Sequence, residues 1–305
     1  MTVRSVNAGA GVDWLKRGFD LGRNNPKAIF GGAVLLLVAV LALAIAGSML
    51  MAMLATLLKP TGTAALLMSV LFGGAVMALM AALIVGYLRL LDAVENGRPA
   101  SATLVFSGFG DKAAALRAVG FMLVLMVAQN LLVFGLVAAL APEFGSWYLQ
   151  NLQSSMAGVA QAPPTSLPAG FGTVMVLMWI VGTFCYAVQA IGLGQIALRA
   201  RGVGAAFSDG VSGAAKNLLP LLVLFLVVLV AVIVLVIAIM LLALVAGLLA
   251  KLVGAWLLVL VGIPLYIGFL VAMLVVMFGV MYYLWRDVCD DGMAPGADEG
   301  DAFEA

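Results

Sequence analysis

Four amide side chains lie deep within long apolar stretches of this chain: Gln129, Asn130, Gln189 and Gln195. Gln129 is twelve residues from Arg117, and Gln189 is ten residues from Arg199. At about 1.5 Å per helical residue, both amides sit about 15–18 Å from the charged edge and are expected to meet across a helix hairpin. Such groups either hydrogen-bond one helix to another, for about 0.6 kcal/mol each, or bind a neutral solute along an intramembrane path.

Other residue types offer little for catalysis or metal binding. The chain has no histidine, and its apolar stretches carry no acidic or basic residue in their middle. Proton relays, voltage sensors and side-chain cation filters depend on such residues, so these classes are disfavoured. No nucleophile–base pair or metal-ligand cluster is recognisable. We therefore expect a protein that is not an enzyme, with no catalytic residue, metal site or cofactor.

Six long apolar stretches determine where the other residues of the chain can lie. Hydrophobic residues make up 65% of the 305 and charged residues only 10%. A bilayer core about 30 Å thick is spanned by about 20 apolar residues, and a backbone in hydrocarbon must pair its own polar groups. The sequence therefore predicts an all-α integral membrane protein with six transmembrane helices, at residues 28–58, 64–88, 118–140, 171–198, 218–250 and 252–285.

The basic residues are distributed unevenly between the two sides of this arrangement. Thirteen of the fifteen flank one side, and only Lys59 and Lys251 fall on the other. Because positive loops remain in the cytoplasm, both termini are predicted to be cytoplasmic. The expected partner is the lipid bilayer with its anionic inner leaflet, another membrane protein is a second candidate, and no nucleic acid is expected.

The chain reads as three copies of one unit, at about 12–91, 101–198 and 204–286. Each unit is a short cytoplasmic amphipathic segment followed by a two-helix hairpin. Aligning Gly18, Gly108 and Gly210 places Asn25 and Asn217 at the same offset. All three units enter from one side, which predicts parallel hairpin repeats about the membrane normal. A chance match between short amphipathic linkers is the alternative.

The segment at residues 12–23 shows why these linkers are predicted to be interfacial helices. Apolar side chains fall on one helical face and charged ones on the other, which suits the headgroup level of an anionic leaflet. Asn25 and Pro26 then form an N-cap and a first-turn proline that open the next helix. The candidate lipid-interface residues are Trp14, Lys16, Arg17, Phe19 and Arg23.

Two stretches carry a resemblance to a known family. They are the opening Gly11-Val12-Asp13-Trp14-Leu15-Lys16-Arg17-Gly18-Phe19 with Asn25-Pro26, and Gly97-Arg98-Pro99 with Phe106-Ser107-Gly108-Phe109. They resemble a family of uncharacterised bacterial multi-pass inner-membrane proteins, which is distantly similar to the membrane domain of some glycerophosphodiester phosphodiesterases. The resemblance implies an inner-membrane location and the hairpin layout. It brings no functional residues, because this chain lacks the soluble phosphodiesterase domain.

The domain prediction is one polytopic membrane domain at 1–286 and an acidic, disordered cytoplasmic tail at 287–305. Seven glycines inside the spans are expected to let helices pack closely, namely Gly31, Gly32, Gly73, Gly74, Gly182, Gly192 and Gly194. For function we expect a protein that supports membrane or envelope organisation, or the assembly of other membrane proteins. The alternative is a transporter or channel for a neutral or amphiphilic solute, with its path near Gln129, Asn130 and Gln189.

Overall fold

The computed structural model describes residues 3–59, 62–156, 166–254 and 256–289, which form helices and no strand. Six of these helices are long and apolar enough to cross a membrane. They are α2 (Pro26–Leu58), α3 (Thr63–Glu95), α5 (Lys112–Leu140), α7 (Phe171–Arg199), α9 (Leu218–Val253) and α10 (Trp256–Cys289). The prediction of an all-α chain with six helices of membrane-spanning length is confirmed.

Shorter helices connect the spans. They are α1 (Ala10–Asp20), η1 (Leu21–Arg23), η2 (Ala102–Phe106), α4 (Ser107–Gly110), α6 (Pro142–Met156) and α8 (Val203–Lys216). The predicted tail begins inside α10, because that helix continues to Cys289, and the rest of the tail, 290–305, lies outside the described residues.

Polar side chains mark where two of the spans, α2 and α5, begin. The Asn25 side chain accepts a hydrogen bond from the backbone N–H of Ala28 at 3.1 Å, ahead of Pro26, which confirms the predicted cap. Asp111 caps α5 in the same way, accepting from Ala114 at 3.0 Å. Each cap satisfies an N–H that the first helical turn leaves unpaired.

Asn217 shares the offset of Asn25 in the sequence but has a different role. Its side chain does not cap α9. Instead its Oδ1 accepts from the backbone N–H of Val6 at 2.8 Å, and its Nδ2 donates to the Arg4 carbonyl at 3.0 Å. Asn217 therefore fastens the N-terminal segment to the start of α9.

The core lies at one end of the bundle, where α3, α7 and α10 finish and α2, α5 and α9 begin. We call this the basic end, because the thirteen basic residues counted above flank it. There the Tyr87 and Phe278 rings lie 4.9 Å apart, joining α3 to α10. The Trp285 indole packs on Gly194, joining α10 to α7. The last turns of α3, α7 and α10 are therefore buried against one another.

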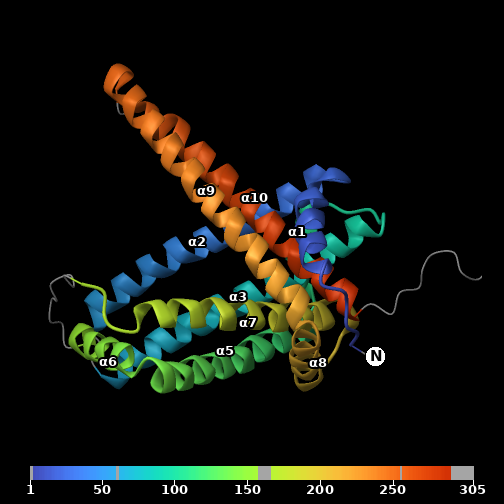
Figure 1. Cartoon of the computed structure of the whole chain (residues 1–305), viewed down its shortest axis with the longest axis horizontal. Helices are drawn as coiled ribbons and strands as arrows, with labels where there is room; N and C mark the ends of the chain where they lie inside the picture. The colour runs from blue at the N-terminus through green and yellow to red at the C-terminus, as the bar shows by residue number, and fades with distance from the viewer. Residues whose placement is uncertain (1–2, 60–61, 157–165, 255, 290–305) are drawn as a thin grey trace, which may run out of the picture.

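Away from the basic end the helices spread apart. The hairpin of α9 and α10 diverges from the layer of α3, α5 and α7, so the molecule widens along its length (Figure 1). Large apolar side chains on these outer halves are exposed, such as Leu71 on α3, Met240 on α9 and Leu265 on α10. In a bilayer such surfaces face lipid, where an apolar side chain costs nothing to expose.

Three glycines hold the short helices onto the ends of the spans. A Cβ on any of them would come within 3.1 Å, or closer, of a backbone carbonyl oxygen on a neighbouring span. The contacts are Gly18 with Val276 of α10, Gly108 with Ala82 of α3, and Gly210 with Val188 of α7. These glycines are the three that the sequence aligns. The middle linker differs from the other two in form, because it is split into η2 and the four-residue α4.

Candidate functional site

The deep amides are not joined into a polar cluster. Gln129 is half-buried and lines a cavity of about 120 Å³ between α5, α7 and α8, beside Cys185. Asn130 is exposed and donates to the Met126 carbonyl of its own helix at 2.8 Å. Gln189 is half-buried and is not part of that cavity wall. Within the described part of the chain, no hydrogen bond joins Gln129 to Gln189.

Gln195 lies in a different environment from the other three amides. It is 1% exposed, at the basic end of α7, and its Nε2 donates to Asp209 of α8 at 3.4 Å. Asp209 also accepts from Nε and Nη2 of Arg201, at 3.1 and 2.9 Å. The Oε1 of Gln195 has no hydrogen-bond partner among the described residues. The geometry makes Gln195 part of the contact between α7 and α8.

Trp14, which was expected at the lipid headgroups, is fully buried within the protein. Its Nε1 donates to Oδ2 of Asp287 at 2.9 Å, and Arg17 binds the same carboxylate. Gly11 and Gly18 explain the burial: without side chains, they let α1 approach the backbones of α9 and α10 closely. The aromatic face of α1 therefore packs against protein at this point.

The remaining interfacial candidates divide by their exposure. Three of them are exposed, namely Lys16, Phe19 and Arg23. Arg17 is half-buried, and its guanidinium carbon lies 4.6 Å from the centre of the Tyr283 ring. Arg23 pairs with Asp20 at 3.3 Å, but both side chains are mostly exposed, so the pair adds little stability.

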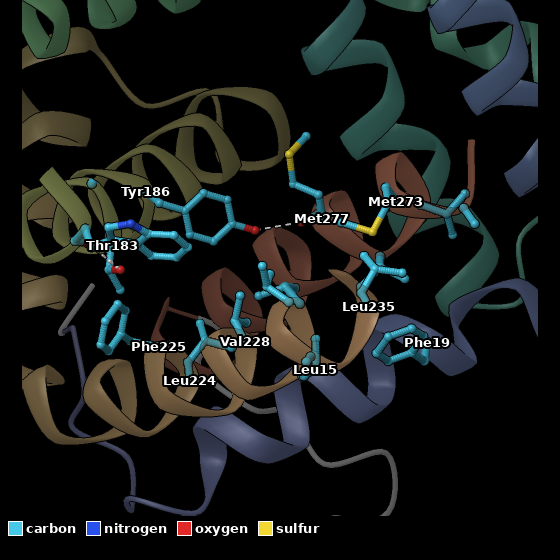
Figure 2. A pocket seen from close by; sticks show the side chains of 18 of the residues that line it. Leu15, Phe19, Thr183, Tyr186, Leu224, Phe225, Val228, Leu235, Met273 and Met277 are labelled. Atoms are coloured by element: carbon cyan, nitrogen blue, oxygen red, sulfur yellow. Dashed lines mark hydrogen bonds between the residues drawn. The ribbon is translucent and has the colours of Figure 1, made fainter. Parts of the chain in front are cut away.

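A large hollow between the helices was not anticipated from the sequence. A groove of about 910 Å³ runs between α7, α9 and α10 and is bounded at the basic end by α1 (Figure 2). We call it the apolar groove. Residues that line it include Leu15 and Phe19 of α1, Thr183 and Tyr186 of α7, Val228 of α9 and Met277 of α10.

Two hydroxyl groups in the wall of the apolar groove are already paired. The Tyr186 hydroxyl donates to the Met277 carbonyl at 2.6 Å, and the Thr183 hydroxyl donates to the Trp179 carbonyl at 2.9 Å (Figure 2). The wall is therefore suited to an apolar guest.

The span glycines expected to pack closely have different surroundings, as two of them show. Gly182 lines the apolar groove, and a Cβ there would meet open space. Gly194 lies directly beneath the Trp285 indole, where a Cβ would collide with the ring. Gly194 therefore serves the close packing predicted for it, whereas Gly182 borders a hollow.

Arginines and lysines behave differently around the basic end. Five arginines there bind carboxylates: Arg17 with Asp287, Arg89 with Asp111, Arg98 with Asp92, Arg201 with Asp209, and Arg286 with Glu95. The hydrogen bond from Arg89 holds the pKa of the Asp111 carboxyl below its usual value. Lys16, Lys27 and Lys112 are exposed, and none of them forms an ion pair with another described residue.

No known protein family, curated protein or solved structure matches this chain. Within the described residues, no three histidine, cysteine, aspartate or glutamate side chains gather in a group that could hold a metal ion. The apolar groove and the charges beside it are therefore the features on which a functional proposal rests.

Proposed function

We propose that this chain is a non-enzymatic protein of a bacterial inner membrane, which supports membrane organisation by holding an apolar guest. The observation that carries the proposal is the apolar groove, a hollow of about 910 Å³ that is lined mainly by apolar side chains and whose wall hydroxyls are already hydrogen-bonded. Because such a wall offers water few partners, an apolar guest is more stable there than solvent.

The length of the apolar groove suits a guest that comes from one leaflet. Its lining extends over similar lengths of three helices, at 175–186, 224–235 and 269–280. At about 1.5 Å per residue each of these stretches rises about 16 Å, close to half of a hydrocarbon core about 30 Å thick. The guest therefore has the dimensions of a lipid chain lying along the helices.

The orientation and the repeat belong to the same proposal. The thirteen basic residues at the basic end support placing that end, with both termini, in the cytoplasm. The matching contacts of Gly18, Gly108 and Gly210 support three parallel hairpin repeats, each entered through a cytoplasmic segment. The family resemblance is consistent with this arrangement.

A pair of glycine substitutions tests the proposal. Gly182→Leu places a side chain in the apolar groove, and Gly135→Leu places the same side chain on an exposed face of α5. Native mass spectrometry in mild detergent would count the amphiphiles that each purified protein retains. We expect wild type and Gly135→Leu to retain a chemically unchanged guest, and Gly182→Leu to lose it. Equal retention by Gly182→Leu and wild type would refute the groove as the site.

A transporter for a neutral or amphiphilic solute is the second candidate. It is favoured by the cavity of about 120 Å³ that Gln129 lines with Cys185. That cavity provides an amide at the depth where an intramembrane path is expected.

A further inference from the structure

We infer that the guest of the apolar groove is a phospholipid of the inner leaflet with an anionic headgroup, held by Lys16 and Lys27. This inference rests on the proposed function and names the class of guest. Its acyl chains lie in the groove, and its phosphate lies at the end of the groove that α1 bounds.

The first argument is that arginines and lysines at the basic end have different partners. Five carboxylates at the basic end are each bound by an arginine, so they do not compete for the lysines. Lys16 and Lys27 are exposed and form no ion pair with another described residue. Lys16 stays unpaired although Asp13 and Asp20 lie about one helical turn away on α1. A lysine ammonium on a flexible stem suits a mobile anionic headgroup, whereas a planar arginine suits a fixed carboxylate.

The position of these lysines is the second argument. Lys16 follows Leu15 and precedes Phe19 by less than one helical turn, and both of these apolar residues line the groove. Lys27 lies one turn before Phe30, which also lines the groove. Long lysine stems lie along apolar surface while the ammonium stays in the polar region. Both lysines therefore lie within one helical turn of residues that line the end of the groove.

The volume of the groove is the third argument. Ligand-binding clefts of about 300–1,000 Å³ bury most of a drug-sized ligand. A groove of about 910 Å³ lies near the top of this range. It is therefore large enough to take the acyl chains of a lipid.

The experiment measures headgroup selectivity in three versions of the full chain. Wild type, the double variant Lys16→Gln/Lys27→Gln and the control Lys112→Gln are incubated with equal amounts of phosphatidylglycerol and phosphatidylcholine. Native mass spectrometry then gives the ratio of the two retained lipids. Lys112 is the matched control, because it is equally unpaired but lies on α5, which contributes nothing to the groove lining.

We expect wild type and Lys112→Gln to prefer phosphatidylglycerol by up to about 25-fold, since each lysine contributes about fivefold. The double variant should lose the preference while retaining as much total lipid. Retention without headgroup preference in wild type would overturn this inference and leave the proposed function intact. A preference that survives in the double variant, or falls equally in Lys112→Gln, would also overturn it. Loss of all lipid from wild type would instead refute the proposed function.

Discussion

Replacing Asp287 should loosen the attachment of α1 to the rest of the molecule. This carboxylate, near the end of α10, accepts hydrogen bonds from the buried Trp14 indole and from Arg17. Asp287→Ala removes both interactions at once. Asp287→Asn keeps an oxygen that can accept from Trp14 and removes only the charge that faces Arg17.

The magnitude follows from the burial of each group. Trp14 is fully buried, so an indole N–H left without an acceptor costs about 1–3 kcal/mol. The side chains of Arg17 and Asp287 are 38% and 25% exposed, so screening reduces their ion pair to at most about 1 kcal/mol. Asp287→Ala should therefore destabilise the protein by about 2–4 kcal/mol, and Asp287→Asn by about 1 kcal/mol.

Thermal unfolding of the purified protein in one detergent would measure the order of stability. Asp20→Ala is the control, because it removes a pair whose side chains are 80% and 64% exposed and should leave the unfolding temperature unchanged. We expect wild type and Asp20→Ala to unfold last, preceded by Asp287→Asn, with Asp287→Ala unfolding first. If Asp287→Ala unfolds together with wild type, the buried position of Trp14 is refuted.

Three further predictions concern other parts of the molecule. Gly86→Ala should lower stability by about 1–3 kcal/mol, because the added Cβ would collide with the backbone of η2. Gly73→Ala is the control and should not lower stability, because its added Cβ meets open space. Thermal unfolding of the two variants measures the difference. Cys185 should resist an impermeant maleimide in a chain whose other cysteine is replaced by serine, and rapid labelling would favour the transporter. The hydrogen bond from Arg89 lowers the pKa of Asp111, so its contribution to stability is present at neutral pH and is lost as pH falls below about 4. Asp111→Asn should therefore reduce the acid sensitivity of unfolding measured between about pH 7 and pH 3.

The number and place of the spans could be predicted because the bilayer imposes a simple rule on composition. Long apolar runs must be helices of sufficient length, and the first five predicted runs each fall in a long helix. The sixth, at 252–285, was placed too early, since 252–253 belong to α9 and α10 begins at Trp256. The ends were less predictable. The third span was expected to begin at residue 118, but α5 begins at Lys112. Helical hydrogen bonding continues past the apolar run, because charged side chains such as Lys112 remain exposed beyond it.

The burial of Trp14 could not be read from the amphipathic pattern alone. A helical face with aromatic and apolar residues suits lipid and protein equally, so the pattern does not say which one covers it. One signal did point to protein. Gly11, Trp14 and Gly18 share a face at spacings of three and four residues, and glycines beside a large side chain indicate close approach to another backbone.

The depth of each amide along its helix predicted its surroundings less well than the direction in which its side chain leaves the helix. Gln129 and Gln189 were placed at similar depth, yet only Gln129 lines the small cavity between their helices. The apolar groove was hidden for a related reason: it arises from the divergence of α9 and α10 from α7, which no single span encodes (Figure 1). The apolar sequence of a transmembrane helix indicates that its side chains contact apolar groups. It does not indicate whether those groups belong to lipid or to a neighbouring helix.

The sequence also does not distinguish the roles of the basic residues. A positive-inside count treats arginine and lysine alike, but in the structure five arginines bind carboxylates, whereas Lys16, Lys27 and Lys112 are exposed. Substituting an arginine such as Arg89 should therefore lower stability, because it leaves Asp111 without its ion-pair partner. Substituting Lys16 should change which lipid the protein retains and leave stability intact. Stability and lipid selectivity thus distinguish the carboxylate-bound arginines from the exposed lysines, although the sequence shows both only as basic residues on one side.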